Sequence, residues 1–231
     1  LGYVGVATCD TIDGAYKFVA GWRPDGLRSL DMTIFVDTGS SSSSGGGSSS
    51  SSSNTTIEPV AYLVRSVDNQ YTGFSRLTPD FVNTTSDGIV SRGPKCEGNA
   101  VWKEQQRWFM MCSHLTGWHA NPAILARSNQ SDLVGASWSE LGNPTKKGYS
   151  YDSQPTYVLP LALPQGRLLI YMGDRWNEAS ESAPGSVGGA SYVWLPLLHN
   201  KSDVTGFSMP LLHGKWNGTG TWRVADYLEP Y

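Results

Sequence analysis

Three polar residues hold equivalent positions in a repeated sequence pattern. Each repeat starts at a polar residue, runs through an apolar stretch, turns, returns through an aromatic-rich stretch and ends in a small polar cluster. The starting residues are Asp31, Glu97 and Gln154. Acidic groups gathered in a cleft among aromatic side chains can cleave glycosidic bonds, because one acid protonates the leaving oxygen while a second group assists water.

The repeats predict β-hairpins, with residues 31–36, 97–102 and 154–159 as their first strands. A second unit consists of a strand, a polar turn, a glycine and an aromatic residue, at 4–16 and again at 124–138. Together the two units give four strands per repeat, at the spacing of β-propeller blades with long loops. Since the innermost strands of a propeller line its channel, we expect Asp31, Glu97 and Gln154 to meet at one end of that channel.

The composition favours the same class of fold. Glycine and aromatic residues are abundant and charged residues make up only 16% of the chain, which favours short strands over long helices and predicts an all-β protein. The 17 Lys and Arg residues form no basic stripe, and the formal charge is −3, so nucleic acid is not an expected partner. Apolar runs are too short to predict a membrane span.

Two features concern the extent of the domain. A Ser/Gly-rich stretch at 38–56 offers almost nothing to bury and is interpreted as a flexible loop inserted into a hairpin of a single domain, 1–231. Leu1 is not an initiator Met, and 1–8 already reads as a strand. We therefore expect three to four blades from these residues, with the N-terminal blade missing.

Cysteines and glycosylation motifs favour a secreted protein. Cys96 and Cys112 fall at the outer ends of one predicted hairpin, where a disulfide can form, and Cys9 can pair with an upstream part; three buried thiols are an equally weighted alternative. Five Asn-x-Ser/Thr motifs lie in polar stretches and predict an extracellular or cell-wall glycoprotein. Their asparagines are Asn54, Asn83, Asn129, Asn200 and Asn217.

Seven stretches, in order along nearly the whole chain, resemble the exo-β-1,3-galactanase branch of glycoside hydrolase family 43. The most specific are Gly-Trp-x-x-Asn-Pro at 117–122 and Tyr-Met-Gly-Asp-Arg-Trp at 171–176. The others lie at 5–8, 30–35, 75–78, 152–158 and 192–196. The resemblance implies a five-bladed β-propeller and an inverting hydrolase that releases galactose from the non-reducing end of β-1,3-galactan, the core of arabinogalactan.

The resemblance also implies roles for the three repeat-starting residues. Glu97 corresponds to the general acid, Asp31 to the aspartate that tunes and orients that acid, and Gln154 to an amide that replaces the usual base. As alternatives, Glu97 is a solvated carboxylate at a strand end and Asp31 a turn cap. For inversion, the carboxyl group and the water-holding group are expected to lie about 6.5–9.5 Å apart.

Further residues are candidates for binding the sugar. Trp118 and Trp176 are predicted to stack on sugar faces, whereas most other tryptophans are expected in the core. Asn69 and Gly117 match positions that line the sugar site in the family, and their alternative is a role in turns.

Two further residues, Arg175 and His114, are assigned structural rather than chemical roles. Arg175 is read as part of a buried ion pair, with bracing of an acid as the alternative. His114 can point into the channel but is read as a hydrogen-bonding histidine, so neither a metal nor any other cofactor is predicted.

The chain departs from the family at two points. The acid motif of the family is Glu-Ala-Pro, but here Glu97 is followed by Gly98 and Asn99. The first blade, with a further sugar-binding glutamate, has no counterpart. These departures keep open a catalytically inactive propeller that binds galactan or glycoprotein glycans, and an enzyme acting on arabinose or xylose is a third reading.

Overall fold

The computed structural model describes residues 2–39, 58–85, 91–104, 106–145, 149–176, 190–200 and 205–210, together with Tyr227. The predicted loop insertion at 38–56 lies outside the described residues except for Thr38 and Gly39. The candidate glycosylation sites Asn54 and Asn217 also lie outside them.

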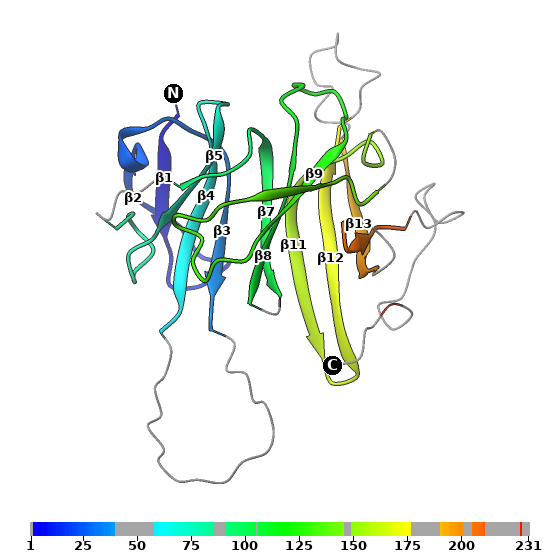
Figure 1. Cartoon of the computed structure of the whole chain (residues 1–231). Coiled ribbons are helices and arrows are strands. Elements are labelled where there is room, and N and C mark those ends of the chain that lie inside the picture. Colours follow the sequence, from blue (N-terminus) through cyan, green and yellow to red (C-terminus); the bar gives the residue numbers. More distant parts are fainter. Residues whose placement is uncertain are drawn as a thin grey trace.

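Within these residues, fourteen strands form four antiparallel sheets (Figure 1). A two-stranded sheet pairs β1 (Val4–Thr8) with β2 (Lys17–Trp22). The first four-stranded sheet contains β3 (Ser29–Asp37), β4 (Val60–Val67), β5 (Tyr71–Arg76) and β6 (Ser91–Arg92). The second contains β7 (Glu97–Glu104), β8 (Arg107–Ser113), β9 (Ala123–Ser128) and β10 (Ser139–Gly142). The third contains β11 (Gln154–Leu163), β12 (Gly166–Arg175), β13 (Ser191–His199) and β14 (Phe207–Ser208).

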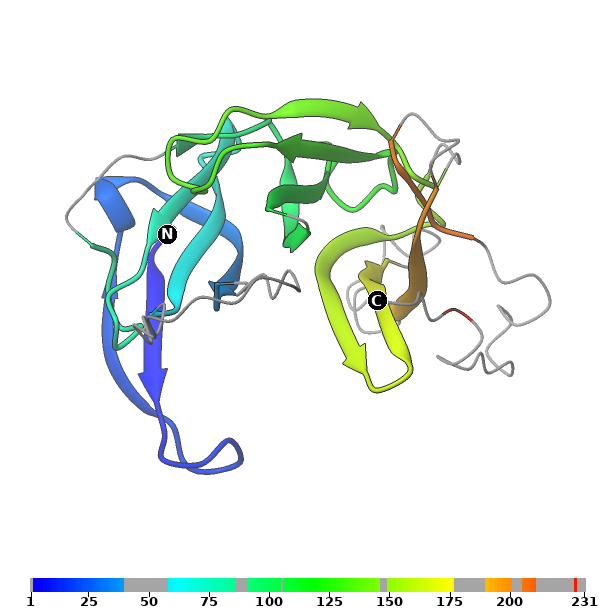
Figure 2. The same ribbon diagram turned by 60° about the horizontal axis from the view of Figure 1, so that its bottom comes forward.

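Each four-stranded sheet keeps its strands in chain order, as a propeller blade does. The sheets stand side by side in an arc (Figure 2), and β7 lies next to both β3 and β11. The prediction of an all-β propeller is therefore confirmed. Three four-stranded blades and one two-stranded sheet agree with the predicted three to four blades. β1 and β2 form an antiparallel pair, as do β9 and β10, which are the two outer strands of their blade.

The cores lie between neighbouring blades. One core packs β7–β10 against β11–β14 around Trp102, Tyr171 and Leu195. A second packs β3–β6 against β7–β10 around Phe74 and Trp108. Strands with a blade on each side are buried on both faces, which explains why β4 and β8 read as nearly continuous apolar runs.

Two smaller features complete the fold. Cys96, which precedes β7, and Cys112 on β8 form a disulfide with a Cα–Cα distance of 5.8 Å, while Cys9 is a free thiol. The only helix among the described residues is a 3-10 turn at Pro24–Gly26. None of the described residues forms a helix long and apolar enough to cross a membrane.

Candidate active site

A cavity of about 530 Å³ opens where the inner strands of the three blades begin. Asp31 comes from β3, Glu97 from β7 and Gln154 from β11, so the fold brings together the three residues that the repeat singled out. The other lining residues are Met32, Gly98, Asn99, Gly117, Trp118, Pro155, Thr156, Asp174 and Trp176. The lining contains three carboxylates and neither Lys nor Arg.

The pairing register shifts at the cavity end of each inner strand. The shifts lie between Ser29 and Met32 on β3, between Glu97 and Ala100 on β7, and between Pro155 and Tyr157 on β11. A bulge of this kind changes the direction of a side chain without ending the strand, and bulges are common beside active sites. The same local irregularity therefore sets the orientation of the candidate residue in each blade.

Glu97 has an environment suited to a general acid. Its side chain is half-buried, and burial together with the nearby Asp31 carboxylate raises the pKa of Glu97. A hydrogen bond from Gln154 acts in the opposite direction and is the weaker effect. An acid with a raised pKa keeps its proton closer to neutral pH, where it can protonate a leaving oxygen.

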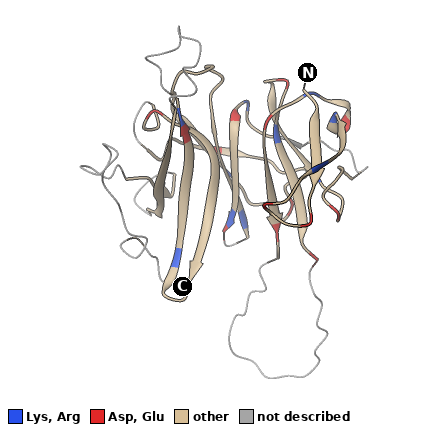
Figure 3. Ribbon diagram, turned by 180° about the vertical axis from the view of Figure 1, so that it is seen from behind, with Lys and Arg blue, Asp and Glu red and all other residues tan. Residues whose placement is uncertain are grey.

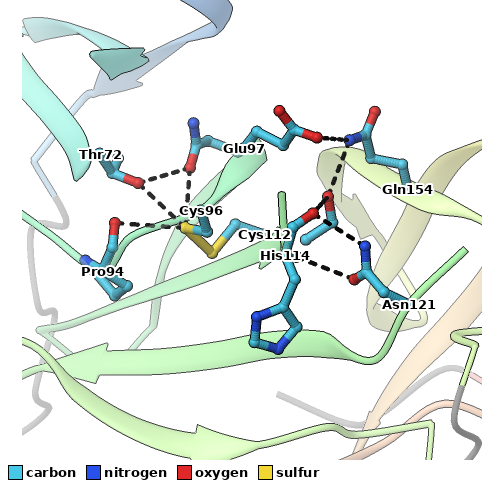
Figure 4. The surroundings of a disulfide bond; sticks show 10 residues. Thr72, Pro94, Cys96, Glu97, Cys112, His114, Asn121 and Gln154 are labelled. Atoms are coloured by element: carbon cyan, nitrogen blue, oxygen red, sulfur yellow. Dashed lines mark hydrogen bonds between the residues drawn. A yellow bond between two sulfur atoms is a disulfide. The ribbon is translucent and has the colours of Figure 1, made fainter. Parts of the chain in front are cut away.

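Gln154 lies in direct contact with Glu97 (Figure 4). Its Nε2 is 3.4 Å from Glu97 Oε1 and 2.9 Å from Ser113 Oγ. The expected separation of 6.5–9.5 Å between the acid and the water-holding group is therefore wrong for these side chains. The physical reason is that two carboxylates repel each other, whereas an amide N–H donates to a carboxylate and draws the two groups together.

Asp174 is a third carboxylate at the cavity that the sequence analysis did not select. It lies at the end of β12, directly opposite Gln154 in the strand pairing. Burial, and then the Asp31 carboxylate, raise the pKa of Asp174. Ser113 holds the equivalent place in the neighbouring blade, opposite Glu97. The polar cluster that ends each repeat was the signal that could have identified both residues.

Asn99 is a third residue that the sequence analysis did not select. Its side chain is 2% exposed and lines the cavity, and its Oδ1 accepts a hydrogen bond from Thr72 Oγ1 at 2.9 Å. Its Nδ2 has no hydrogen-bond partner among the described residues. A buried amide N–H without a partner is costly, so Asn99 offers a donor at the wall of the cavity.

The predicted aromatic residues also lie at the cavity. Trp118 is 53% exposed, and its ring meets that of Trp176 edge-on at a centroid distance of 4.7 Å. The loop that carries Trp118 is held by Asn121, which bonds the backbone N–H and carbonyl of His114 (Figure 4) and the hydroxyl of Thr116. Gly117, beside Trp118, has a φ of 62°, in the left-handed region that favours glycine.

Three other candidates do not line the cavity. Asn69 occupies the turn between β4 and β5, so its sugar-binding role stays a prediction. The imidazole of His114 points away from Glu97 and Gln154 (Figure 4). Arg175 lies 3.5 Å from Asp152, and both side chains are partly exposed, so the expected burial of this ion pair is wrong. The described residues include no group of His, Cys, Asp or Glu side chains placed to hold a metal ion.

Comparisons with known proteins show relatives of the same fold. No protein-family model matches the sequence, and no curated protein does. Among solved structures, the exo-β-1,3-galactanase from Clostridium thermocellum is 28% identical with a TM-score of 0.72, over 91% of this chain and 42% of that one. A β-1,3-galactosidase of glycoside hydrolase family 43 is 28% identical with a TM-score of 0.70, over 90% of this chain and 38% of that one.

A variant of the exo-β-1,3-galactanase from Phanerochaete chrysosporium, solved with β-1,3-galactotriose, is 27% identical with a TM-score of 0.67, over 90% of this chain and 42% of that one. The chain resembles the exo-β-1,3-galactanases of glycoside hydrolase family 43. It spans about two fifths of the length of these three relatives.

The departure from the galactanase acid motif has a local explanation. Gly98 has a φ of 60°, and a Cβ atom there would lie 2.6 Å from Gln154 Cγ and 2.7 Å from the Pro155 carbonyl oxygen. Both distances are too short for a side chain. In this galactanase-like site, glycine at position 98 is thus required for β7 and β11 to approach each other, and its flexibility is limited by that packing.

Proposed function

We propose that the protein is an exo-β-1,3-galactanase, which releases galactose from the non-reducing end of β-1,3-galactan. The observation that carries the proposal is the placement of Glu97, with its raised pKa, between Asp31 and Gln154 at a cavity edged by tryptophan. The resemblance to a galactanase solved with β-1,3-galactotriose supports galactan as the substrate.

In the proposed reaction, Glu97 donates its proton to the glycosidic oxygen as the bond to the anomeric carbon breaks. Asp31 keeps Glu97 protonated, because its negative charge disfavours a second negative charge nearby. Gln154 holds the attacking water through its amide oxygen, which accepts no hydrogen bond within the described residues. Water that attacks from the side opposite the leaving group inverts the anomeric centre, and the proton that it loses passes to bulk water. Because the anomeric carbon and this water must lie between Glu97 and Gln154, the contact between the two side chains opens when the sugar binds.

The size and lining of the cavity support action at a chain end. A volume of about 530 Å³ is in the range of small-ligand sites and suits a terminal sugar rather than a long stretch of polysaccharide. The exposed face of Trp118 is suited to stacking on a sugar ring, because C–H groups of sugars pack against aromatic faces.

We also propose that the protein is secreted and glycosylated. The Cys96–Cys112 disulfide supports this, because disulfides persist in oxidising compartments. Asn83 and Asn129 are exposed, as acceptors of a glycan must be.

The test is incubation of the full-length protein with unbranched β-1,3-galactan, with chromatography of the released galactose and NMR of its first-formed anomer. Glu97→Gln serves as the acid variant, and Glu140→Gln, at an exposed site on β10, serves as the matched control. We expect release of α-galactose by the wild type and the control, and about a thousandfold slower release by Glu97→Gln.

The same assay tests the alternatives. Retention on a galactan column without release would identify a non-catalytic glycan-binding protein. Hydrolysis of aryl α-L-arabinofuranosides or β-xylosides in preference to galactan would identify the third reading.

A further inference from the structure

Ser113 is a buried residue whose hydroxyl contacts the amide of Gln154. It ends β8, pairs directly with Glu97 across the β7–β8 ladder, and is 2% exposed. Its Oγ donates to the backbone carbonyl of His114 at 3.3 Å and accepts from Gln154 Nε2 at 2.9 Å. The proposed reaction assigns no role to this side chain.

The number of protons on each group fixes the direction of these bonds. A serine hydroxyl has one proton, and in Ser113 that proton is directed to the carbonyl of His114, so toward Gln154 the hydroxyl can only accept. The amide nitrogen of Gln154 has two protons, of which one points to Ser113 Oγ and the other to Glu97 Oε1. Both N–H groups are therefore directed at β7 and β8, and the amide oxygen remains the end available to water.

We propose that Ser113 is a positioning residue that fixes which end of the Gln154 amide faces the attacking water. The inference rests on the proposed function. Only the oxygen end can accept a hydrogen bond from the water, because the amide nitrogen has no lone pair available for it. An amide turned by 180° presents N–H groups to the water and cannot assist its attack.

Ser113 is needed because protonated Glu97, the form that acts as the acid, does not fix the orientation of the Gln154 amide. An ionised Glu97 accepts from the amide nitrogen, but a protonated Glu97 can instead donate to the amide oxygen. In that second arrangement the amide is reversed and the proton of the acid is held away from the substrate. With its own proton on the His114 carbonyl, Ser113 accepts from the amide nitrogen in both forms of Glu97 and so favours the productive arrangement.

The first test is Ser113→Ala in the full-length protein, in the wild-type background and in a Gln154→Glu background. Loss of one hydrogen bond predicts a fall in kcat of about tenfold, with KM changed less than about twofold. A carboxylate at position 154 has two equivalent oxygens and no wrong orientation, so there the same substitution is expected to lower kcat by less than about twofold. Ser128→Ala, at a serine that is also 2% exposed but lies on β9, is the matched control.

The second test is the pH profile of kcat. In Ser113→Ala, the reversed amide accepts from protonated Glu97 and stabilises that form, so the alkaline limb is expected to move to higher pH. The other ionisable groups facing Glu97 are Asp31 from β3 and Asp174 from β12, and both remain in the variant. Ser113→Thr keeps the hydroxyl group. Its kcat and the alkaline limb of its pH profile should therefore match those of the wild type.

The outcomes are distinguishable. A wild type that releases no galactose would overturn the proposed function itself. With an active wild type, an equal loss of kcat in both backgrounds, together with an unmoved alkaline limb, would overturn the role of Ser113 and leave a packing effect. If Gln154→Glu has no turnover, the pH profile and the rescue by threonine decide the question alone.

Discussion

The two ends of β7 carry the same residue type in opposite surroundings. At the cavity end, Glu97 faces the carboxylate of Asp31 and contacts the neutral amide of Gln154. At the other end, Glu104 is 8% exposed, and its oxygens lie 2.5 Å from His199 Nε2 and 3.3 Å from Arg167 Nη1. Figure 3 shows an acidic residue at the cavity end of β7, and both basic and acidic residues at the opposite end of the β7–β8 hairpin.

This difference separates a carboxyl group whose pKa is raised from one that contacts two basic side chains. Glu104 joins β7 to β12 and β13, and removing it would leave two basic side chains without their acidic partner. Glu97 has no basic partner among the residues that line its cavity, so its proton can leave and return during a reaction. One end of the strand carries an ion-pair cluster, and the other carries the residue that we propose as the general acid.

The largest expected effect is on activity at the cavity end. Glu97→Gln keeps the shape of the side chain but removes the transferable proton, so kcat on β-1,3-galactan should fall by about a thousandfold. Glu104→Gln, assayed in parallel below its melting temperature, should change kcat less than about twofold. Equal losses of kcat would contradict the division of roles between the two ends.

At the opposite end, we expect the effect to be on stability. Glu104→Gln leaves Arg167 and His199 facing a neutral group and should lower the free energy of unfolding by about 2 kcal/mol, which is less than for a fully buried pair because both basic side chains are about one third exposed. Urea denaturation measures the change. Glu97→Gln is the counterpart, and a comparable loss of stability there would contradict the comparison.

Asp31→Asn tests how strongly Asp31 raises the pKa of Glu97 at the cavity end of β7. The negative charge of Asp31 raises the pKa of Glu97, so its removal lowers that pKa and moves the alkaline limb of the kcat profile to lower pH. Asp10→Asn, at an exposed position near the end of β1, is the control, and the pH profile of its kcat should match that of the wild type. A limb that moves to higher pH in Asp31→Asn would show that Asp31 does not act on Glu97 through its charge.

The smallest effect is the pH dependence of stability. Because the pKa of Glu97 is raised, the folded protein keeps this proton to higher pH than the unfolded chain does. The free energy of unfolding should therefore fall as pH rises from the ordinary glutamate pKa through the raised one. Glu97→Gln should flatten this part of the curve in urea denaturation series, whereas Glu140→Gln should not.

The sequence was informative where one residue position repeats. Asp31, Glu97 and Gln154 were found because each starts a copy of the repeated pattern, and the blade order follows from the same repeat. Asp174 and Ser113 were missed because their approach to the cavity depends on the pairing register at strand ends, which the bulges determine. The pairing of Glu104 was equally hidden, since its partners come from two later strands and form no local motif.

The contact between Glu97 and Gln154 was missed for a different reason. The expected separation came from enzymes in which both groups are carboxylates, and it did not allow for the attraction between an amide and an acid. The replacement of a base by an amide changes the resting geometry as well as the proton chemistry.

The register shifts at the three inner strands have a consequence for how such a site can change. Each shift belongs to a single blade, and the blades share no strand, so a change in one blade acts first on the direction of its own candidate side chain. Substitutions, insertions or deletions of one residue at 29–32, 97–100 or 155–157 are therefore the changes by which a scaffold of this kind can acquire a new sugar preference. Libraries restricted to these short segments, with Gly98 and the buried Ala100 kept unchanged, would explore that range while preserving the core between the second and third four-stranded blades.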